Sequence, residues 1–191
     1  MSATREAERA PLVLASASPQ RRAILERVGA AFVVRPANIE EIERGENPAA
    51  VARENALGKA RAARLHPRET VLGVDTLVAL HGRIYGKPGD REAARATLTA
   101  LGGATHTVFS GVAVLVDGEE RVAVAATEVS FRELSEARIE WYLAKDEWRG
   151  RAGAYAIQGA GAALVREIHG DYENVVGLPL ATLLDLYPKL L

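Results

Sequence analysis

Two patterns of hydrophobic positions alternate along the first half of the chain. Short continuous apolar runs are typical of buried strands, and apolar residues three or four positions apart are typical of helices with one buried face. The first pattern predicts strands over residues 12–14, 32–35 and 70–80. The second predicts helices over 19–28, 48–65 and 91–101. Each helix follows a residue suited to capping its first turn: Ser18, Asn47 and Asp90.

The second half of the chain changes to an antiparallel pattern. Two long strand-like segments flank an Asp117-Gly118 turn, which predicts a β-hairpin over 105–134. We then expect a helix over 136–145, a pair of strands interrupted by glycines within 152–170, and a closing helix over 178–191. Alternating strands and helices followed by an antiparallel hairpin predict an α/β fold with a mixed central sheet.

Composition narrows the class of protein. The chain has 191 residues, of which 48% are hydrophobic and 26% charged, with a formal net charge of −1. These values suit one globular domain over 11–191, preceded by a loose extension at 1–10. The small net charge offers no basic surface to nucleic acid, and no apolar run reaches the roughly 18–20 residues of a membrane span. Because the chain has no cysteine and no secretory signal, we expect a cytoplasmic protein.

The first strand runs into a turn with more polar side chains than a helix start needs. In the sequence LVLASASPQRR, Ser18 is the N-cap and Pro19 takes the first helical position. Ser16 and Arg21 have no such role, and a cation in the first turn opposes the helix dipole. Hydroxyls, N–H groups and a guanidinium at a helix N-terminus form an anion site, usually for phosphate. A capped helix with a solvated arginine pair is the alternative.

Other polar residues lie where folding does not require them. Asp75 lies within the apolar strand GVDTLV, where an ionised carboxylate is costly unless it is paired or binds a metal. Lys87 lies on the proline-stiffened loop GKPG, and Gln158 lies beside glycines that allow a ligand to approach closely. Taken alone, Lys59 indicates a solvated basic helix face and Glu41 a charged loop.

The sequence lacks the motifs of several other kinds of catalytic and binding site. The chain has no GxxxxGK[ST] loop and no GxSxG elbow, and its four histidines lack the spacing of metal ligands. Phosphate-binding side chains and a few carboxylates remain. Together they indicate metal-assisted attack on a polyphosphate.

In their order along the chain, these segments resemble the Maf family of nucleoside triphosphate pyrophosphatases. The resemblance runs from about Leu12 to Leu184 and is carried by LASASPQRR, GKARA, GVDTLV, GKP, THTVFSGV, TEVSFREL, RAGAYAIQG and GDYENVVGLPL. It implies a strongly bent, mixed central sheet with flanking helices and a deep nucleotide cleft, similar to the inosine triphosphatases. It also implies hydrolysis of a nucleoside triphosphate to the monophosphate and pyrophosphate with a divalent metal cation, Mg²⁺ or Mn²⁺.

The resemblance further implies roles for individual residues. It implies phosphate binding by Ser16, Ser18, Arg21, Lys59 and Lys87. Asp75 matches the proton acceptor of the family, and Glu41 matches an acidic position near the metal. Asp75 would thus serve as base, as metal ligand or as both.

Substrate choice in the family follows three positions, which are Gln20, Thr76 and Gln158 in this chain. Thr76 and Gln158 match the branch that acts on dTTP and UTP. Gln20 departs from the arginine usual in that branch and from the tryptophan of the 7-methyl-GTP branch. We therefore expect a dTTP/UTP pyrophosphatase; the alternatives are a pyrophosphatase for non-standard purine or 7-methyl-GTP nucleotides and a nucleotide-binding regulator of cell division without turnover. By family analogy, a homodimer is one option for its oligomeric state.

Overall fold

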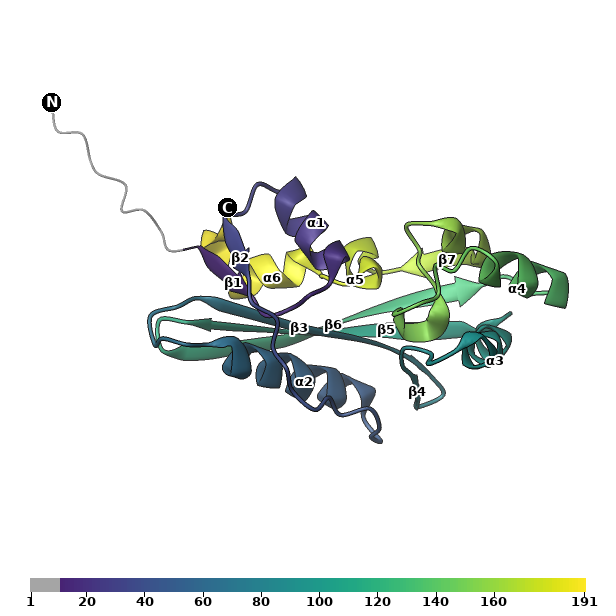
Figure 1. Ribbon diagram of the computed structural model, residues 1–191, viewed down its shortest axis with the longest axis horizontal. Helices are drawn as coiled ribbons and strands as arrows, with labels where there is room; N and C mark the ends of the chain where they lie inside the picture. Colours follow the sequence, from purple (N-terminus) through teal and green to yellow (C-terminus); the bar gives the residue numbers. More distant parts are fainter. Residues whose placement is uncertain (1–10) are drawn as a thin grey trace, which may run out of the picture.

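A mixed seven-stranded sheet runs along the molecule (Figure 1). The computed structural model describes residues 11–191, so the predicted extension at 1–10 lies outside the described residues. The strands are β1 (Leu12–Leu14), β2 (Phe32–Val34), β3 (Val71–Leu80), β4 (Arg83–Tyr85), β5 (Thr105–Val116), β6 (Glu119–Phe131) and β7 (Val165–His169). Their order is β2-β1-β3-β5-β6-β7, with β4 paired to β3. The pairs of β1 with β2 and β3 are parallel and the others antiparallel, which confirms the mixed sheet.

Helices cover both faces of this sheet. The α-helices within 11–191 are α1 (Pro19–Arg27), α2 (Pro48–Ala63), α3 (Arg91–Leu101), α4 (Glu136–Leu143), α5 (Tyr172–Val176) and α6 (Leu180–Leu186). In Figure 1, α2 lies below the sheet, whereas α1, α5 and α6 lie above it. The predicted capping residues Ser18, Asn47 and Asp90 each accept a hydrogen bond from a backbone N–H in the first turn of their helices. None of the helices within 11–191 is long and apolar enough to cross a membrane.

The region over 152–170 differs from the predicted pair of strands. Only β7 forms there, and the rest folds as two short 3₁₀ helices, η1 (Ala152–Ala154) and η2 (Ala160–Leu164). Gly153 and Ala154 have φ values of 70° and 60°, which turn the chain and prevent an extended strand. The apolar residues Tyr155 and Ile157 are buried in a core cluster instead of a sheet ladder.

The closing helix is shorter than predicted, and α5 before it is absent from the prediction. Helix α6 ends at Leu186, and η3 (Pro188–Leu190) follows, because Pro188 lacks the N–H that would continue the α-helix. Asp171 caps α5 by accepting a hydrogen bond from Glu173 N at 2.8 Å.

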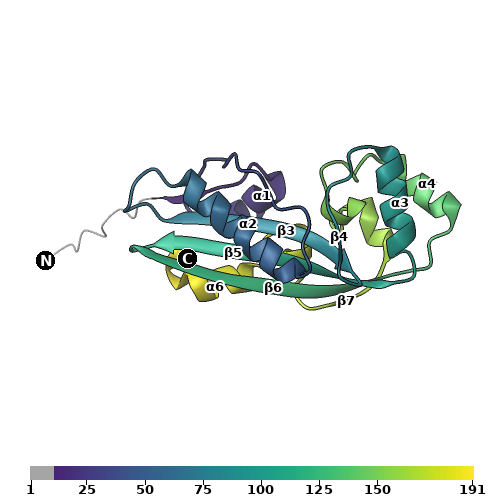
Figure 2. The same ribbon diagram turned by 90° about the horizontal axis from the view of Figure 1, so that it is seen from below.

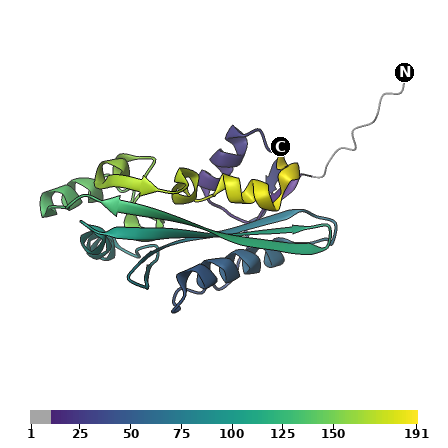
Figure 3. The ribbon, with the colours of Figure 1, turned by 180° about the vertical axis from the view of Figure 1, so that it is seen from behind.

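Two groups of helices divide the molecule into two ends. Helices α3 and α4 pack with η1 and η2 at one end, and α1, α2 and α6 lie at the other (Figure 2). The long strands β5 and β6 connect the two ends, and seen from behind they cross each other because the sheet is twisted (Figure 3). One core cluster is built around Leu98, Tyr142 and Trp148 at the first end, and another around Leu14, Ile24 and Leu72 at the second.

Helix α2 lies unusually close to the sheet. A methyl group on Gly111 of β5 would lie 2.1 Å from the carbonyl oxygen of Ala52, and one on Gly73 of β3 would lie 2.1 Å from that of Ala56. Only glycine allows backbone to approach this closely. The side chains of α2 are therefore carried directly onto the surface of β3.

We expect Gly111→Ala to destabilise the protein, because the new methyl group would overlap the backbone of α2. Overpacking costs about 1–3 kcal/mol, which corresponds to a fall in melting temperature of about 2–12 °C for a protein of this length. The measurement is thermal unfolding followed by circular dichroism. Gly89→Ala is the control, since nothing lies within 4 Å of a methyl group there. Equal melting temperatures for the two variants would contradict the close packing of α2.

Candidate active site

The candidate site lies at a gap along one edge of β3. Strand β1 pairs with β3 at Val71 and Leu72, and β4 pairs with it only from Val78 onward. Within 11–191, no strand covers positions 73–77 on this edge. The adjacent residues Asp75 and Thr76 lie in the gap and point to opposite faces of the sheet. Side chains from both faces can therefore border the same opening.

A buried cluster of charged and polar groups surrounds Asp75 on the α2 face. Lys59 Nζ donates to Asp75 Oδ1 at 2.6 Å and lies 2.9 Å from Glu41 Oε1. Asn55 Nδ2 donates to Asp75 Oδ2 at 3.1 Å. Asn55 also pairs with both backbone groups of Ile42, at 2.8 and 3.0 Å, and so holds the loop that carries Glu41. Because Asn55 and Lys59 are four positions apart, they lie on the same face of α2.

Arg21 is buried on the other face of β3 among neutral acceptors. Its Nε donates to the carbonyl oxygen of Gly177 at 2.9 Å, Nη1 to Ser16 Oγ at 2.8 Å, and Nη2 to Thr76 Oγ1 at 3.2 Å. Burial lowers the pKa of Arg21, while the negative charges of Asp75 and Glu41 act in the opposite direction and raise it. No carboxylate within 11–191 forms a salt bridge with Arg21.

The serines of the turn before α1 also stabilise the turn itself. Ser18 Oγ accepts from Arg21 N at 3.5 Å, which confirms the N-cap, and donates to Gln20 Oε1 at 3.1 Å. Ser16 Oγ accepts from Ser18 N at 3.2 Å. Ser16 therefore has a structural role that the sequence did not reveal, because it closes the turn and holds Arg21.

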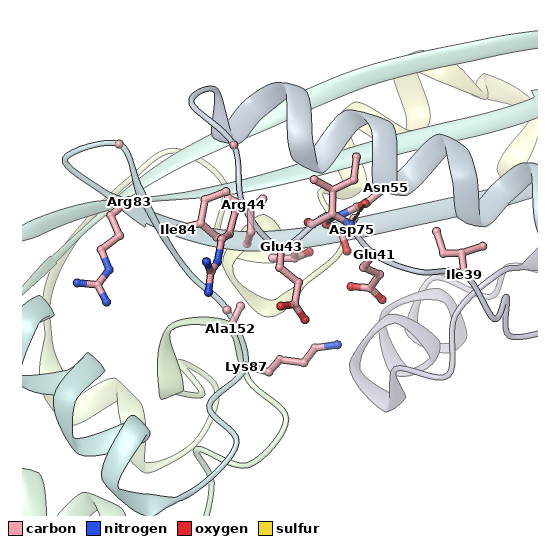
Figure 4. Close-up of a pocket in the computed structure, with 16 residues that line it drawn as sticks. Ile39, Glu41, Glu43, Arg44, Asn55, Asp75, Arg83, Ile84, Lys87 and Ala152 are labelled. Atoms are coloured by element: carbon pink, nitrogen blue, oxygen red, sulfur yellow. Dashed lines mark hydrogen bonds between the residues drawn. The ribbon is translucent and has the colours of Figure 1, made fainter.

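Two cavities meet at the gap. The larger, of about 850 Å³, lies on the Asp75 side, where Lys87 lies across the opening from Glu41 (Figure 4). The smaller, of about 500 Å³, lies between the turn before α1 and residues 149–158. Glu41, Thr76, Lys87 and Ala152 border both cavities. The two cavities are therefore parts of one cleft between the two ends of the molecule.

All the residues predicted for the site border this cleft. They are Ser16, Ser18, Gln20, Arg21, Glu41, Lys59, Asp75, Thr76, Lys87 and Gln158. The expectation that Lys59 taken alone belongs to a solvated face is wrong, because the side chain is 9% exposed and paired with two carboxylates. The alternative of a solvated arginine pair is wrong for Arg21, which is buried.

A family model described as Maf-like protein matches residues 11–190. The chain belongs to this family. The dTTP/UTP pyrophosphatase of Moorella thermoacetica is 50% identical over 179 residues, which cover 92% of each chain. The dTTP/UTP pyrophosphatase of Lacticaseibacillus casei is 45% identical over 175 residues, which cover 90% of this chain and 95% of that protein. A solved HAM1 protein from Coxiella burnetii aligns with 64% of this chain and 73% of its own, at 18% identity and a TM-score of 0.46.

Asp75 and Glu41 are two carboxylates of this Maf-like cleft that could hold a metal ion together with substrate phosphates. Within 11–191, no group of three or more acidic, histidine or cysteine side chains is arranged to hold a metal. Asp75 and Glu41 nevertheless both contact Lys59 Nζ, so one cation can lie close to both carboxylates. Mg²⁺ commonly binds one or two protein carboxylates together with substrate phosphates and water. These two side chains suit that arrangement.

Two polar residues of this Maf-like site are not among the predicted ones. Asn55 is the first, and its position one helical turn before Lys59 is a signal that could have found it. Ser110 is the second: it is fully buried on β5, and its Oγ lies 2.8 Å from Thr76 Oγ1. Its contact depends on the pairing of Thr76 with Ser110 between β3 and β5, which no local pattern specifies.

We expect Asp75→Asn to lower kcat for nucleoside triphosphate hydrolysis by about 10²–10⁴-fold, since an amide cannot accept a proton from water. The amide oxygen can still accept from Lys59, whereas the amide nitrogen cannot accept from Asn55, so we expect a folded protein with a lower melting temperature. The measurements are steady-state release of pyrophosphate and the melting temperature. Asp185→Asn, which changes an exposed carboxylate on α6, is the control. Near-normal turnover of Asp75→Asn would remove Asp75 from the chemistry.

Proposed function

We propose that this Maf-like protein hydrolyses dTTP and UTP to the monophosphate and pyrophosphate. The observation that carries the proposal is the buried pair of Asp75 and Lys59, with Glu41 beside Lys59, at the edge of a cleft whose opposite side presents Lys87. Relatives that are 44–50% identical and carry the name dTTP/UTP pyrophosphatase support the same activity.

In the proposed mechanism, Asp75 accepts a proton from a water that attacks the α-phosphate. Lys59 and Asn55 fix the orientation of its carboxylate, because each donates to one of its two oxygens. Lys87 and Arg21 would place positive charge where negative charge develops on the leaving pyrophosphate. A divalent cation bound by Asp75 and Glu41 would supply further neutralisation of the phosphate oxygens.

The smaller cavity supports recognition of a pyrimidine. Apolar side chains of Tyr155, Ile157 and Val176 border it, and they suit the faces of a base. The exposed amide of Gln158 borders the same cavity and can both donate and accept a hydrogen bond. Uracil and thymine present a matching edge with one donor between two acceptors. Thr76 would affect the choice of substrate indirectly, because its Oγ1 accepts a hydrogen bond from the buried guanidinium of Arg21.

The proposal also covers the subcellular location of the enzyme and its oligomeric state. Because dTTP, UTP and Mg²⁺ are cytoplasmic, we place the protein in the cytoplasm. The homodimer suggested by family analogy stays a prediction.

We expect EDTA to stop hydrolysis of UTP and excess Mg²⁺ or Mn²⁺ to restore it, because Asp75 and Glu41 suit a metal that bridges to phosphate. The measurement is pyrophosphate release at a series of free-metal concentrations. Undiminished rates in chelator would show that the carboxylates act without a metal.

We expect the wild-type protein to cleave UTP and dTTP well ahead of CTP, ATP and GTP, because a polar site rejects ligands that leave its groups unpaired. Gln158→Leu should reduce this preference by about tenfold, the effect of one lost hydrogen bond. The measurement is kcat/KM for each triphosphate, with products resolved by ion-exchange chromatography, and Gln158→Asn serves as the conservative comparison. Faster cleavage of ITP or 7-methyl-GTP than of UTP would overturn the pyrimidine assignment.

A further inference from the structure

Arg151 is a cation of the cleft to which the proposed mechanism gives no role. It borders the smaller cavity, and its Nε is buried without a hydrogen-bond partner among residues 11–191. A buried N–H left unpaired costs about 1–3 kcal/mol, and more when the group is charged. Proteins rarely keep such a group unless another molecule satisfies it.

We propose that Arg151 binds the triphosphate chain of the substrate, from the end of the molecule that carries α3 and α4. The proposal rests on the proposed function in naming a nucleoside triphosphate as the ligand. A guanidinium suits this role because it offers several N–H donors to phosphate oxygens in a fixed plane.

The segment that carries Arg151 is held rigidly by buried anchors. Trp148 is 1% exposed, and its Nε1 donates to the carbonyl oxygen of Leu143 at 3.3 Å. Tyr142 Oη accepts from Ala156 N at 2.9 Å. These contacts lie on either side of Arg151, so its backbone is fixed before a ligand arrives. Such preorganisation reduces the entropy lost on binding.

A backbone hydrogen bond places Arg151 on the same wall of the cleft as Lys87. Gly153 N donates to the carbonyl oxygen of Gly86 at 3.3 Å, which joins the turn of Arg151 to the loop of Lys87. A methyl group on Gly153 would lie 2.8 Å from Val78 Cγ2, so this turn is also packed against β3. Both side chains border the smaller cavity.

The charges in the cleft leave Arg151 available to an anion. Within 11–191, no carboxylate forms a salt bridge with Arg151, Lys87 or Arg21. Lys59, in contrast, is paired with two carboxylates. These three cations come from both ends of the molecule: Lys87 and Arg151 from one end and Arg21 from the other. The negative charge of a triphosphate chain between them would offset these positive charges.

Arg166 provides a control outside the cleft. It is an exposed arginine on β7 and borders neither of the two cavities. Its removal tests the general effect of losing one positive charge.

The experiment compares Arg151→Ala, Arg151→Lys and Arg166→Ala in the full chain with UTP and Mg²⁺. We expect kcat/KM to fall about 10- to 100-fold in Arg151→Ala, the effect of losing a charged hydrogen bond. Arg151→Lys should keep part of the activity, and added guanidinium ion should restore part of it to Arg151→Ala, whereas Arg166→Ala should stay within about threefold of the wild type. Melting temperatures show that each variant is folded. Activity of Arg151→Ala within threefold of the wild type would overturn the proposal.

A binding measurement separates this proposal from the proposed function. The non-hydrolysable α,β-imido analogue of UTP and uridine are each titrated into wild type and Arg151→Ala. A loss of affinity for the analogue but not for uridine supports phosphate binding by Arg151. An equal loss for both ligands would show general damage to the cleft and overturn it. If the wild type binds the analogue through Arg151 but hydrolyses neither UTP nor dTTP, the proposed function fails and the inference stands.

Discussion

The close contact between the backbone of α2 and the sheet is the constraint on which the site depends. Gly73 and Gly111 leave no side chain between helix and strands, so α2 lies directly on β3 and β5. At this distance the side chain of Lys59 reaches Asp75 across the interface and is buried with it. A buried ion pair offsets its desolvation only when its geometry is good and its other polar atoms are satisfied. Asn55 and Glu41 meet that condition by contacting the pair from two sides.

The gap along the edge of β3 has an equally specific consequence. In a fully paired sheet, Asp75 and Thr76 would lie in separate compartments, because neighbouring residues of a strand face opposite sides. Here β1 ends and β4 has not begun, so the cleft passes around the open edge and borders both side chains. The carboxylate of Asp75 on one face of the sheet and the buried guanidinium of Arg21 on the other thus border the same cleft.

Local patterns determined much of the fold. The apolar runs, the capping residues Ser18 and Asn47, and the Asp117-Gly118 turn each specify structure through neighbours only a few residues away. The resemblance to the Maf family selected the residues that line the cleft. The prediction of two strands over 152–170 is wrong for its first part, because the apolar residues there fit a strand or a buried turn equally well. Packing against the core around Trp148 decided between them.

The sequence by itself determined which chemical groups are present and, through short-range patterns, most of the elements that carry them. Only the tertiary structure decided their partners. Lys59 belongs to a basic stretch of sequence, yet contact with β3 makes it a buried partner of Asp75. Ser110 becomes a neighbour of Thr76 through strand register. The physical reason is that burial, ion pairing and hydrogen bonding depend on residues distant in the chain, which local propensity does not describe.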